Sequence, residues 1–208
     1  VQITSDNSSG YAGGVAGDSW GGNIENCSVS GSVSGTVFAG GVVGYQAGGS
    51  ITGCSSSATV KGVTIAGGIA GDASGGTLTA CYATGSVSGS GSGTIYVGGV
   101  TGSNTEGTLT VCYHANGTVS GPDGTTGGVA GRNYKAIYDP VITACYWGSN
   151  GQTQGIGYNQ AGTTFETTQV DGTNVKWEDT IDSMNTALQK AGSEWQYEPG
   201  DSLPTLKK

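Results

Sequence analysis

The chain has 208 residues, of which 42 are Gly and only 4 are Pro, and its formal net charge is −8. Without a Gly-X-Y period this composition excludes collagen, and the shortage of Lys and Arg argues against the basic surfaces that bind nucleic acid or anionic membranes. No apolar run approaches the roughly 18 residues of a membrane span, so we expect neither nucleic-acid binding nor membrane insertion.

A short glycine motif opens each of five repeats. A cysteine follows the first glycine of the motif by 14 residues in four repeats and by 18 in the fifth. Self-similarity at a period of 27 to 31 residues is typical of solenoids, in which each unit stacks on the next. The motifs are GGVAG at 13–17, GGVVG at 40–44, GGIAG at 67–71, GGVTG at 98–102 and GGVAG at 127–131, and the cysteines are Cys27, Cys54, Cys81, Cys112 and Cys145.

Alignment of the repeats on the glycine pair gives columns of like residues, which we expect to point inward and to stack about 4.8 Å apart on successive coils. Each coil is predicted to have three strands, exemplified by the segments 39–44, 50–54 and 58–62, with the glycine pair at a corner. The columns are Tyr11, Phe38, Ile65, Tyr96 and Thr125; Val15, Val42, Ile69, Val100 and Val129; and Ile24, Ile51, Leu78, Leu109 and Ile142.

The expected fold is therefore all-β: a parallel β-helix, or β-solenoid, of about five coils over residues 1–150. Its right hand is carried over from β-helices in general. Residues 151–208 lack the repeat, and we expect them to form a small mixed α/β cap over an open end of the solenoid. Within this cap we predict strands at 163–170 and 174–177 and a helix near 178–191, since Ile181, Met184 and Leu188 fall on one helical face.

The repeats resemble a known family. The glycine motif followed by Ile-x-x-Cys, and the stretch CYATGSVSG at 81–89, are similar to the GLUG repeat over about residues 11–147. That repeat occurs in large surface proteins of bacteria, including adhesins and the non-catalytic parts of immunoglobulin A peptidases. The resemblance implies a secreted or cell-surface module. Since residue 1 is Val instead of Met and no signal peptide is present, we interpret the chain as a trimmed product.

The cysteine column is predicted to be a buried ladder of reduced thiols. Stacked side chains point the same way with Cβ atoms about 4.8 Å apart, whereas disulfides favour about 3.5–4.5 Å, so bridges between coils are the less favoured alternative. A zinc site would need clustered ligands, and the cysteines are too widely spaced in sequence. We expect no metal; structural calcium beside Asp18 and Asp72 remains a lesser alternative, and no cofactor is expected.

Catalytic patterns are weak. His114 is the only histidine and is expected at a turn or bulge. The stretch GDSWG at 17–21 matches a hydrolase motif but lacks its strand-to-helix context. Asp18 and Asp72 share a column two coils apart with Tyr45 between them, and we expect no Lys or Arg to join them. These observations predict no catalytic residues and no enzyme activity.

One column is a candidate binding surface. The residue after each cysteine should point outward if the cysteine points inward, which would stack Tyr82, Tyr113 and Tyr146 with Trp147 alongside. Exposed aromatic rings are suited to carbohydrate binding. The alternatives are a ladder that stiffens the wall, or a surface covered by the insertion 132–141. A doubled Thr array over 50–52, 77–79 and 108–110 suggests ice binding as a further alternative.

The function we expect is that of a non-catalytic extracellular module, an adhesin or stalk segment of a larger bacterial protein. The alternative is a carbohydrate-binding module of a secreted hydrolase, and an ice-binding or polysaccharide-degrading β-helix comes third. Expected partners are host glycan or a surface protein, together with other domains of the parent chain. The ligand-binding candidates are Tyr82, Tyr113, Tyr146 and Trp147.

Overall fold

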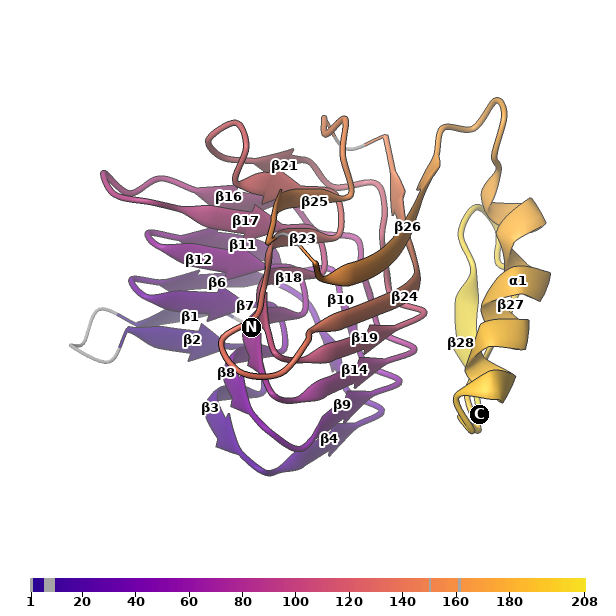
Figure 1. Ribbon diagram of the computed structural model, residues 1–208, viewed down its shortest axis with the longest axis horizontal. Coiled ribbons are helices and arrows are strands. Elements are labelled where there is room, and N and C mark those ends of the chain that lie inside the picture. Colours follow the sequence, from indigo (N-terminus) through magenta and orange to yellow (C-terminus); the bar gives the residue numbers. More distant parts are fainter. Residues whose placement is uncertain (1, 6–9, 150, 161) are drawn as a thin grey trace.

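The computed structural model describes residues 2–5, 10–149, 151–160 and 162–208. Most of this part of the chain is a parallel β-solenoid of about six turns, here called coils one to six from the N-terminus. Figure 1 shows the coils stacked in sequence order, with one helix and a small antiparallel sheet on one side. The predicted β-solenoid is therefore confirmed, with about one more coil than the repeats alone suggested.

Each of the first four coils has five short strands, not the predicted three. Strand β1 (Gln2–Ser5) precedes them and pairs with β6. Coil one contains β2 (Tyr11–Gly13), β3 (Ala16–Trp20), β4 (Asn23–Glu25), β5 (Ser28–Val29) and β6 (Ser32–Gly35). Coil two contains β7 (Phe38–Gly40), β8 (Val43–Ala47), β9 (Ser50–Thr52), β10 (Ser55–Ser56) and β11 (Thr59–Gly62).

The later coils repeat this order and then shorten. Coil three contains β12 (Ile65–Gly67), β13 (Ala70–Ser74), β14 (Thr77–Thr79), β15 (Tyr82–Ala83) and β16 (Val87–Gly89). Coil four contains β17 (Tyr96–Gly98), β18 (Thr101–Thr105), β19 (Thr108–Thr110), β20 (Tyr113–His114) and β21 (Val119–Ser120). Coil five contains β22 (Thr126–Gly127), β23 (Ala130–Tyr134) and β24 (Val141–Gly148), and coil six contains β25 (Ile156–Asn159) and β26 (Thr164–Val170).

Two corners explain why the strands are shorter than predicted. The chain bends at Gly41 and Val42, so segment 39–44 is split between β7 and β8; a Cβ at Gly40 would collide with the carbonyl of Val43, which folds back against it. A second corner lies between the third and fourth strands of coils one to four, and within β24 in coil five, where one residue of each coil has a positive φ. These residues are Asn26 (53°), Gly53 (61°), Ala80 (52°), Val111 (50°) and Ala144 (48°).

Strands of successive coils pair in parallel and in register, as the columns predicted. In the third strand position Ile24, Ile51, Leu78, Leu109 and Ile142 are successive partners. In a regular strand the residue three positions after Ile51 would point outward. The left-handed corner at Gly53 changes this alternation, so Cys54 also points into the core. Val42, Ile69, Val100 and Val129 are fully buried, whereas Val15 of coil one is 46% exposed.

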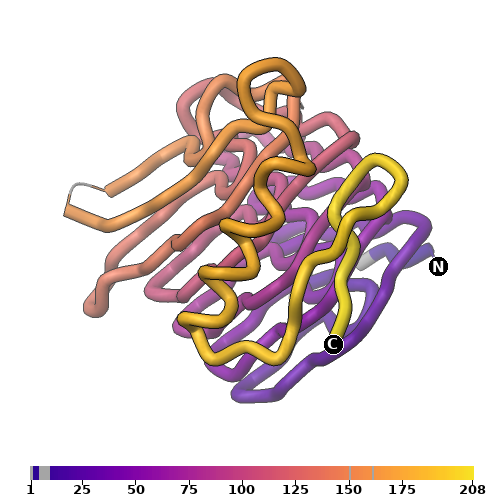
Figure 2. Tube along the Cα trace, turned by 90° about the vertical axis from the view of Figure 1, so that its right-hand side faces the viewer, coloured from indigo at the N-terminus to yellow at the C-terminus, as the bar shows by residue number. Residues whose placement is uncertain are grey.

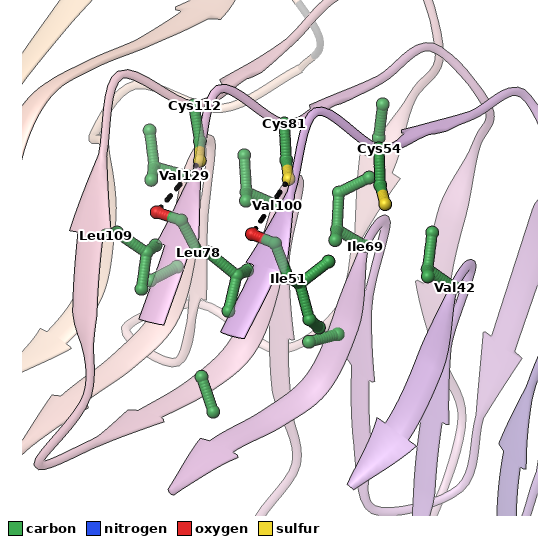
Figure 3. Packing of buried hydrophobic residues seen from close by; sticks show 14 of the residues in the cluster. Val42, Ile51, Cys54, Ile69, Leu78, Cys81, Val100, Leu109, Cys112 and Val129 are labelled. Carbon is green, nitrogen blue, oxygen red and sulfur yellow. Dashed lines mark hydrogen bonds between the residues drawn. The ribbon is translucent and has the colours of Figure 1, made fainter. Parts of the chain in front are cut away.

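The cysteine ladder is confirmed for four of its five members. Figure 3 shows the thiols of Cys54, Cys81 and Cys112 in a row between apolar columns. All five cysteines are free, and Cys54, Cys81, Cys112 and Cys145 are buried. The Cys81 thiol lies 3.3 Å from the Thr79 carbonyl oxygen and 3.4 Å from that of Ile51, in the coil below, and donates to them. Burial raises the pKa of Cys81, as expected of an inert thiol.

Cys27 differs from the prediction, because it is only partly buried. It lies between β4 and β5, which are terminal strands of their sheet among the described residues. Its backbone N–H donates to the Cys54 sulfur at 3.4 Å, but its own thiol is covered from one side only.

The first predicted column has the wrong direction. Tyr11, Phe38 and Tyr96 are only partly buried, and their rings lie on the outer surface of the solenoid. The glycine corner that follows them reverses the side of the sheet on which side chains point. The inward side chains of these strands are instead the next residues, Ala12, Ala39, Ala66 and Val97.

The segment from residue 151 adds strands and then leaves the solenoid. Strands β25 and β26 extend the stacked sheets beyond the repeats. The predicted strand at 163–170 is confirmed, but that at 174–177 is wrong. The Asp171 carboxylate accepts the N–H groups of Thr173, Asn174 and Val175, which organises a turn in place of a ladder. The helix α1 (Trp177–Lys190) begins directly after it, close to the predicted 178–191.

The C-terminal segment, residues 177–208, covers a side wall of the solenoid and not the expected open end. It consists of α1 and the antiparallel pair β27 (Gln196–Glu198) and β28 (Thr205–Lys207). Figure 2 shows α1 lying across several coils with the two strands beside it. No helix of the described residues is long and apolar enough to cross a membrane.

Substitutions of Cys81 test the ladder. We expect Cys81→Ser to lower the free energy of unfolding by about 1–2 kcal/mol, because the hydroxyl keeps the hydrogen bonds. Cys81→Asp should cost more than about 4 kcal/mol, because it places a charge without a counterion in the core. Urea unfolding of both variants and wild type measures the difference. Equal effects of Ser and Asp would contradict the burial of this column.

Thiol labelling tests the direction of the five cysteines. In the native protein we expect one rapidly reacting thiol, Cys27, and four slow ones, because a buried thiol reacts only when its coil opens. Ellman's reagent in buffer and in denaturant gives the native and total counts. Cys27→Ser should remove the fast phase; its persistence in this variant would show that another cysteine is accessible.

Candidate functional site

The predicted tyrosine column exists, but it is covered. Tyr82, Tyr113 and Tyr146 are register partners on successive coils, and the Tyr82 and Tyr113 rings stack 5.0 Å apart at 7°. Tyr113 is fully buried beneath Trp177 and Tyr197, whose ring centroids are 4.9 and 5.6 Å away. The C-terminal segment, and not the insertion 132–141, provides this cover. The column points out of the solenoid, but its central ring, Tyr113, is closed to a ligand.

The fourth binding candidate is on the other side of the wall. Trp147 is the register partner of His114, and both side chains point into the solenoid. Trp147 packs in the main core beside Gly128, where a Cβ would collide with its ring. Because adjacent residues of a strand face opposite sides, Trp147 cannot lie alongside Tyr146.

A different surface presents aromatic side chains to solvent, and we call it the aromatic face. It lies where the sheet β2-β7-β12-β17-β22 meets the sheet β3-β8-β13-β18-β23-β25. The first sheet contributes one outer column and the second contributes two, all in register from coil to coil. The aromatic residues of this face are Tyr11, Trp20, Phe38, Tyr45, Tyr96, Tyr134 and Tyr158.

At the N-terminal end of the aromatic face four rings form a cluster. Tyr45 stacks on Phe38 with centroids 5.2 Å apart and an interplanar angle of 17°, and it contacts Tyr11 at 5.6 Å. The ring centroids of Trp20 and Tyr45 are 6.0 Å apart, with 67° between the ring planes, and Trp20 is 75% exposed. Its indole N–H donates to Asp18 Oδ2 at 2.8 Å, which holds the large exposed ring in one orientation.

Further along the same face lies a polar centre built around Arg132. Its Nε donates to Ser103 Oγ at 2.7 Å, and Nη2 is 4.0 Å from Asp72 Oδ2. The guanidinium carbon lies 4.8 Å from the Tyr96 ring centroid and 5.2 Å from that of Tyr134. The sequence-based expectation that no Lys or Arg joins the acidic column is therefore wrong.

The Asp72 carboxyl is nearly buried, with 6% of its side chain exposed. Thr105 Oγ1 donates to Asp72 Oδ2 at 3.5 Å, while Oδ1 has no hydrogen-bond partner among the described residues. Burial raises the pKa of Asp72 to about 6, although Arg132 and the neighbouring hydroxyls oppose the shift.

This centre could have been found from the sequence. The residue directly after each glycine motif is its column, and these residues are Asp18, Tyr45, Asp72, Ser103 and Arg132. Arg132 is two coils from Asp72, and an arginine side chain is long enough to span that separation.

The other candidate chemistry is distributed differently. His114 is buried in β20, not at a turn; its Nε2 lies 2.9 Å from the Gly85 carbonyl oxygen, and burial lowers its pKa to about 4. Within the described ranges no group of three His, Cys, Asp or Glu side chains is placed to hold a metal ion. Thr52 and Thr79 line a cavity with Trp195 and Lys208, so the Thr array meets the C-terminal segment and is not an open flat surface.

Comparison with known proteins gives one family. A family model described as the GLUG motif matches residues 8–34 and 39–61. These stretches correspond to coils one and two, and coils three and four repeat the same strand order in register with them. No curated protein and no solved structure matches the chain.

The pH dependence of stability tests the environment of Asp72. Its folded-state pKa of about 6 lies above the ordinary 3.8, so the unfolded chain releases this proton first and the free energy of unfolding falls as pH rises through about 6. Asp72→Asn removes this titration. We expect the variant to gain about 3 kcal/mol relative to wild type between pH 4 and 7, measured by urea unfolding at each pH.

The same substitution at the exposed Asp123 is the matched control for loss of one acidic group. A difference between Asp72→Asn and wild type that stays constant over this pH range would contradict the burial of the Asp72 carboxyl.

Proposed function

We propose that this chain, which carries GLUG repeats, is a non-catalytic module of an extracellular adhesin and binds carbohydrate on its aromatic face. GLUG repeats and a β-solenoid fit a repeat module of a larger protein. The kinds of protein in which this repeat occurs support a bacterial, cell-surface location as part of the proposal. The target is glycan on another cell.

The observation that carries the proposal is the state of Trp20. Trp20 is 75% exposed and belongs to a contiguous group of aromatic rings, which is the kind of surface patch that marks a binding site, and the Asp18 hydrogen bond and the Tyr45 contact constrain its ring. A fixed ring loses little conformational entropy when a ligand stacks on it. Sugar rings present C–H faces that pack on such a surface, while their hydroxyls remain hydrated at the edges.

The scaffold favours presentation of this surface over catalysis. Asp18 is engaged with Trp20, Glu25 pairs with Lys208 at 2.6 Å, and Asp72 lies beside Arg132 in a nearly buried position. Asp18 and Asp72 are two coils apart and Asp72 is nearly buried, so they do not form the pair of solvent-exposed carboxyls that glycoside hydrolysis requires.

A glycan array tests the proposal. We expect wild type to bind at least one neutral oligosaccharide and Trp20→Ala to weaken its Kd about tenfold, which corresponds to about 1.4 kcal/mol of stacking. Isothermal titration calorimetry with the best array glycan gives the two Kd values. Because Trp20 is exposed, its replacement should leave the melting temperature nearly unchanged.

The matched control is Phe165→Ala, which removes another exposed ring, 45% accessible, from strand β26 outside the aromatic face. It should leave the Kd unchanged. Absence of binding to every glycan would overturn the proposal in favour of an inert stalk, and capture of a protein but no glycan would replace carbohydrate by a protein ligand. Equal losses in the two variants would show that the aromatic face is not the site.

A further inference from the structure

The aromatic face has two ring clusters at different heights on the solenoid. The first contains Trp20 and Tyr45 on coils one and two; the second contains Tyr96 and Tyr134 on coils four and five, where they flank Arg132. Trp20 and Tyr134 belong to one outer column and lie on coils one and five, four coils apart. At about 4.8 Å per coil their separation is roughly 19 Å, which exceeds the width of one sugar ring.

Arg132 is held as a fixed donor between the rings of the second cluster. Ser103 accepts from its Nε, and the Tyr96 and Tyr134 rings lie at 4.8 and 5.2 Å from the guanidinium carbon. Its side chain remains 23% exposed. A planar guanidinium with a fixed orientation donates hydrogen bonds to oxygen atoms with little loss of side-chain entropy on binding.

The charges around this donor favour a neutral ligand. Asp72 lies 4.0 Å from Arg132 Nη2, so the positive charge is already matched. Asp18 belongs to the same column, and the chain has a formal net charge of −8. An acidic sugar would meet this negative field, and Arg132, the cation of this column, already lies beside Asp72. A neutral hydroxyl accepts from the guanidinium without that cost.

We infer that the ligand is a neutral glycan chain lying parallel to the solenoid axis, stacked on Trp20 at one end and bound by Arg132, Tyr96 and Tyr134 at the other. The inference rests on the proposed carbohydrate binding and adds its charge, length and direction. Sugars between the two clusters pass over the Arg132 side chain, which lies against the buried Ser103 and Asp72.

The length of the glycan provides the first test. Wild type is titrated with oligomers of glucose, N-acetylglucosamine, mannose and xylose of two to six units, and with galacturonate and hyaluronate oligomers of the same lengths. We expect the affinity for one neutral series to rise at least tenfold with length, until the chain spans both clusters, and to exceed that for the acidic oligomers. Equal affinity at all lengths, or tighter binding of an acidic series, would overturn the inference.

Substitutions at both ends provide the second test. Trp20→Ala and Tyr134→Ala should each weaken the longest neutral oligomer about tenfold, whereas the shortest oligomer that binds should be sensitive to only one of them. Arg132→Gln removes the donor, and Lys135→Gln removes a neighbouring positive charge as its control; only the former should weaken binding. Tyr134→Ala leaves Asp72 and Arg132 in place, so it remains informative if Arg132→Gln fails to fold.

The outcomes separate the two proposals. Binding that depends on Trp20 but not on Tyr134 or Arg132 would overturn the axial glycan and leave carbohydrate binding in place. If no oligomer and no array glycan binds, the proposed function fails and the inference fails with it.

Discussion

Parallel hydrogen bonding between residues one coil apart is the constraint on which the structure depends. A strand can satisfy its backbone groups with the coil above and the coil below only if every coil follows the same path. Each position around the coil therefore becomes a column, and a side chain must suit its vertical neighbours. The inward columns of Val, Ile, Leu and Cys, and the glycines that allow β8 to fold back on β7, are consequences of this requirement.

The same constraint produces two rows of outward-pointing aromatic side chains: the column that contains Tyr113, and the aromatic face. The first is covered and the second is exposed. Tyr113 donates its hydroxyl to the Pro204 carbonyl oxygen and is enclosed by Trp177 and Tyr197, so that column is part of the interior formed with the C-terminal segment. On the aromatic face, Trp20 is oriented by its hydrogen bond to Asp18 and remains 75% exposed. Repetition supplies aromatic rows, and what packs on them decides which one can bind.

Much of the fold could be predicted because a period in the sequence translates directly into vertical contacts. The columns of Ile51, Val42 and Cys54 and the helix near 178–191 needed only spacing and polarity. The direction of the Tyr11 column could not be read in this way, since it depends on corners whose φ values the sequence does not state. The cover over Tyr113 was also beyond reach, because it joins residues 91 positions apart without a repeat.

The candidate site was missed for a related reason. The residues that follow the cysteines do form the tyrosine column, but its burial by residues 177–208 has no signal in the local sequence. The column of Arg132 is present in the sequence, but its ion pair joins residues two coils apart, which a comparison of the acidic residues alone does not contain. Side-chain length also mattered, since a guanidinium can bridge coils that a carboxyl cannot.

The C-terminal segment has a mechanical consequence for the array. Lys208 pairs with Glu25 of coil one, Trp195 lies against Gly53 of coil two, the Tyr197 hydroxyl donates to Val111 at the end of β19 in coil four, and Trp177 reaches Gly148 of coil five. In a solenoid with contacts only between neighbours, terminal coils can fray one at a time. The C-terminal segment contacts coils from the first to the fifth, so the unfolding of either terminal coil also removes contacts made by this segment. Such a tether converts a row of separately melting units into one body that resists pulling along its axis.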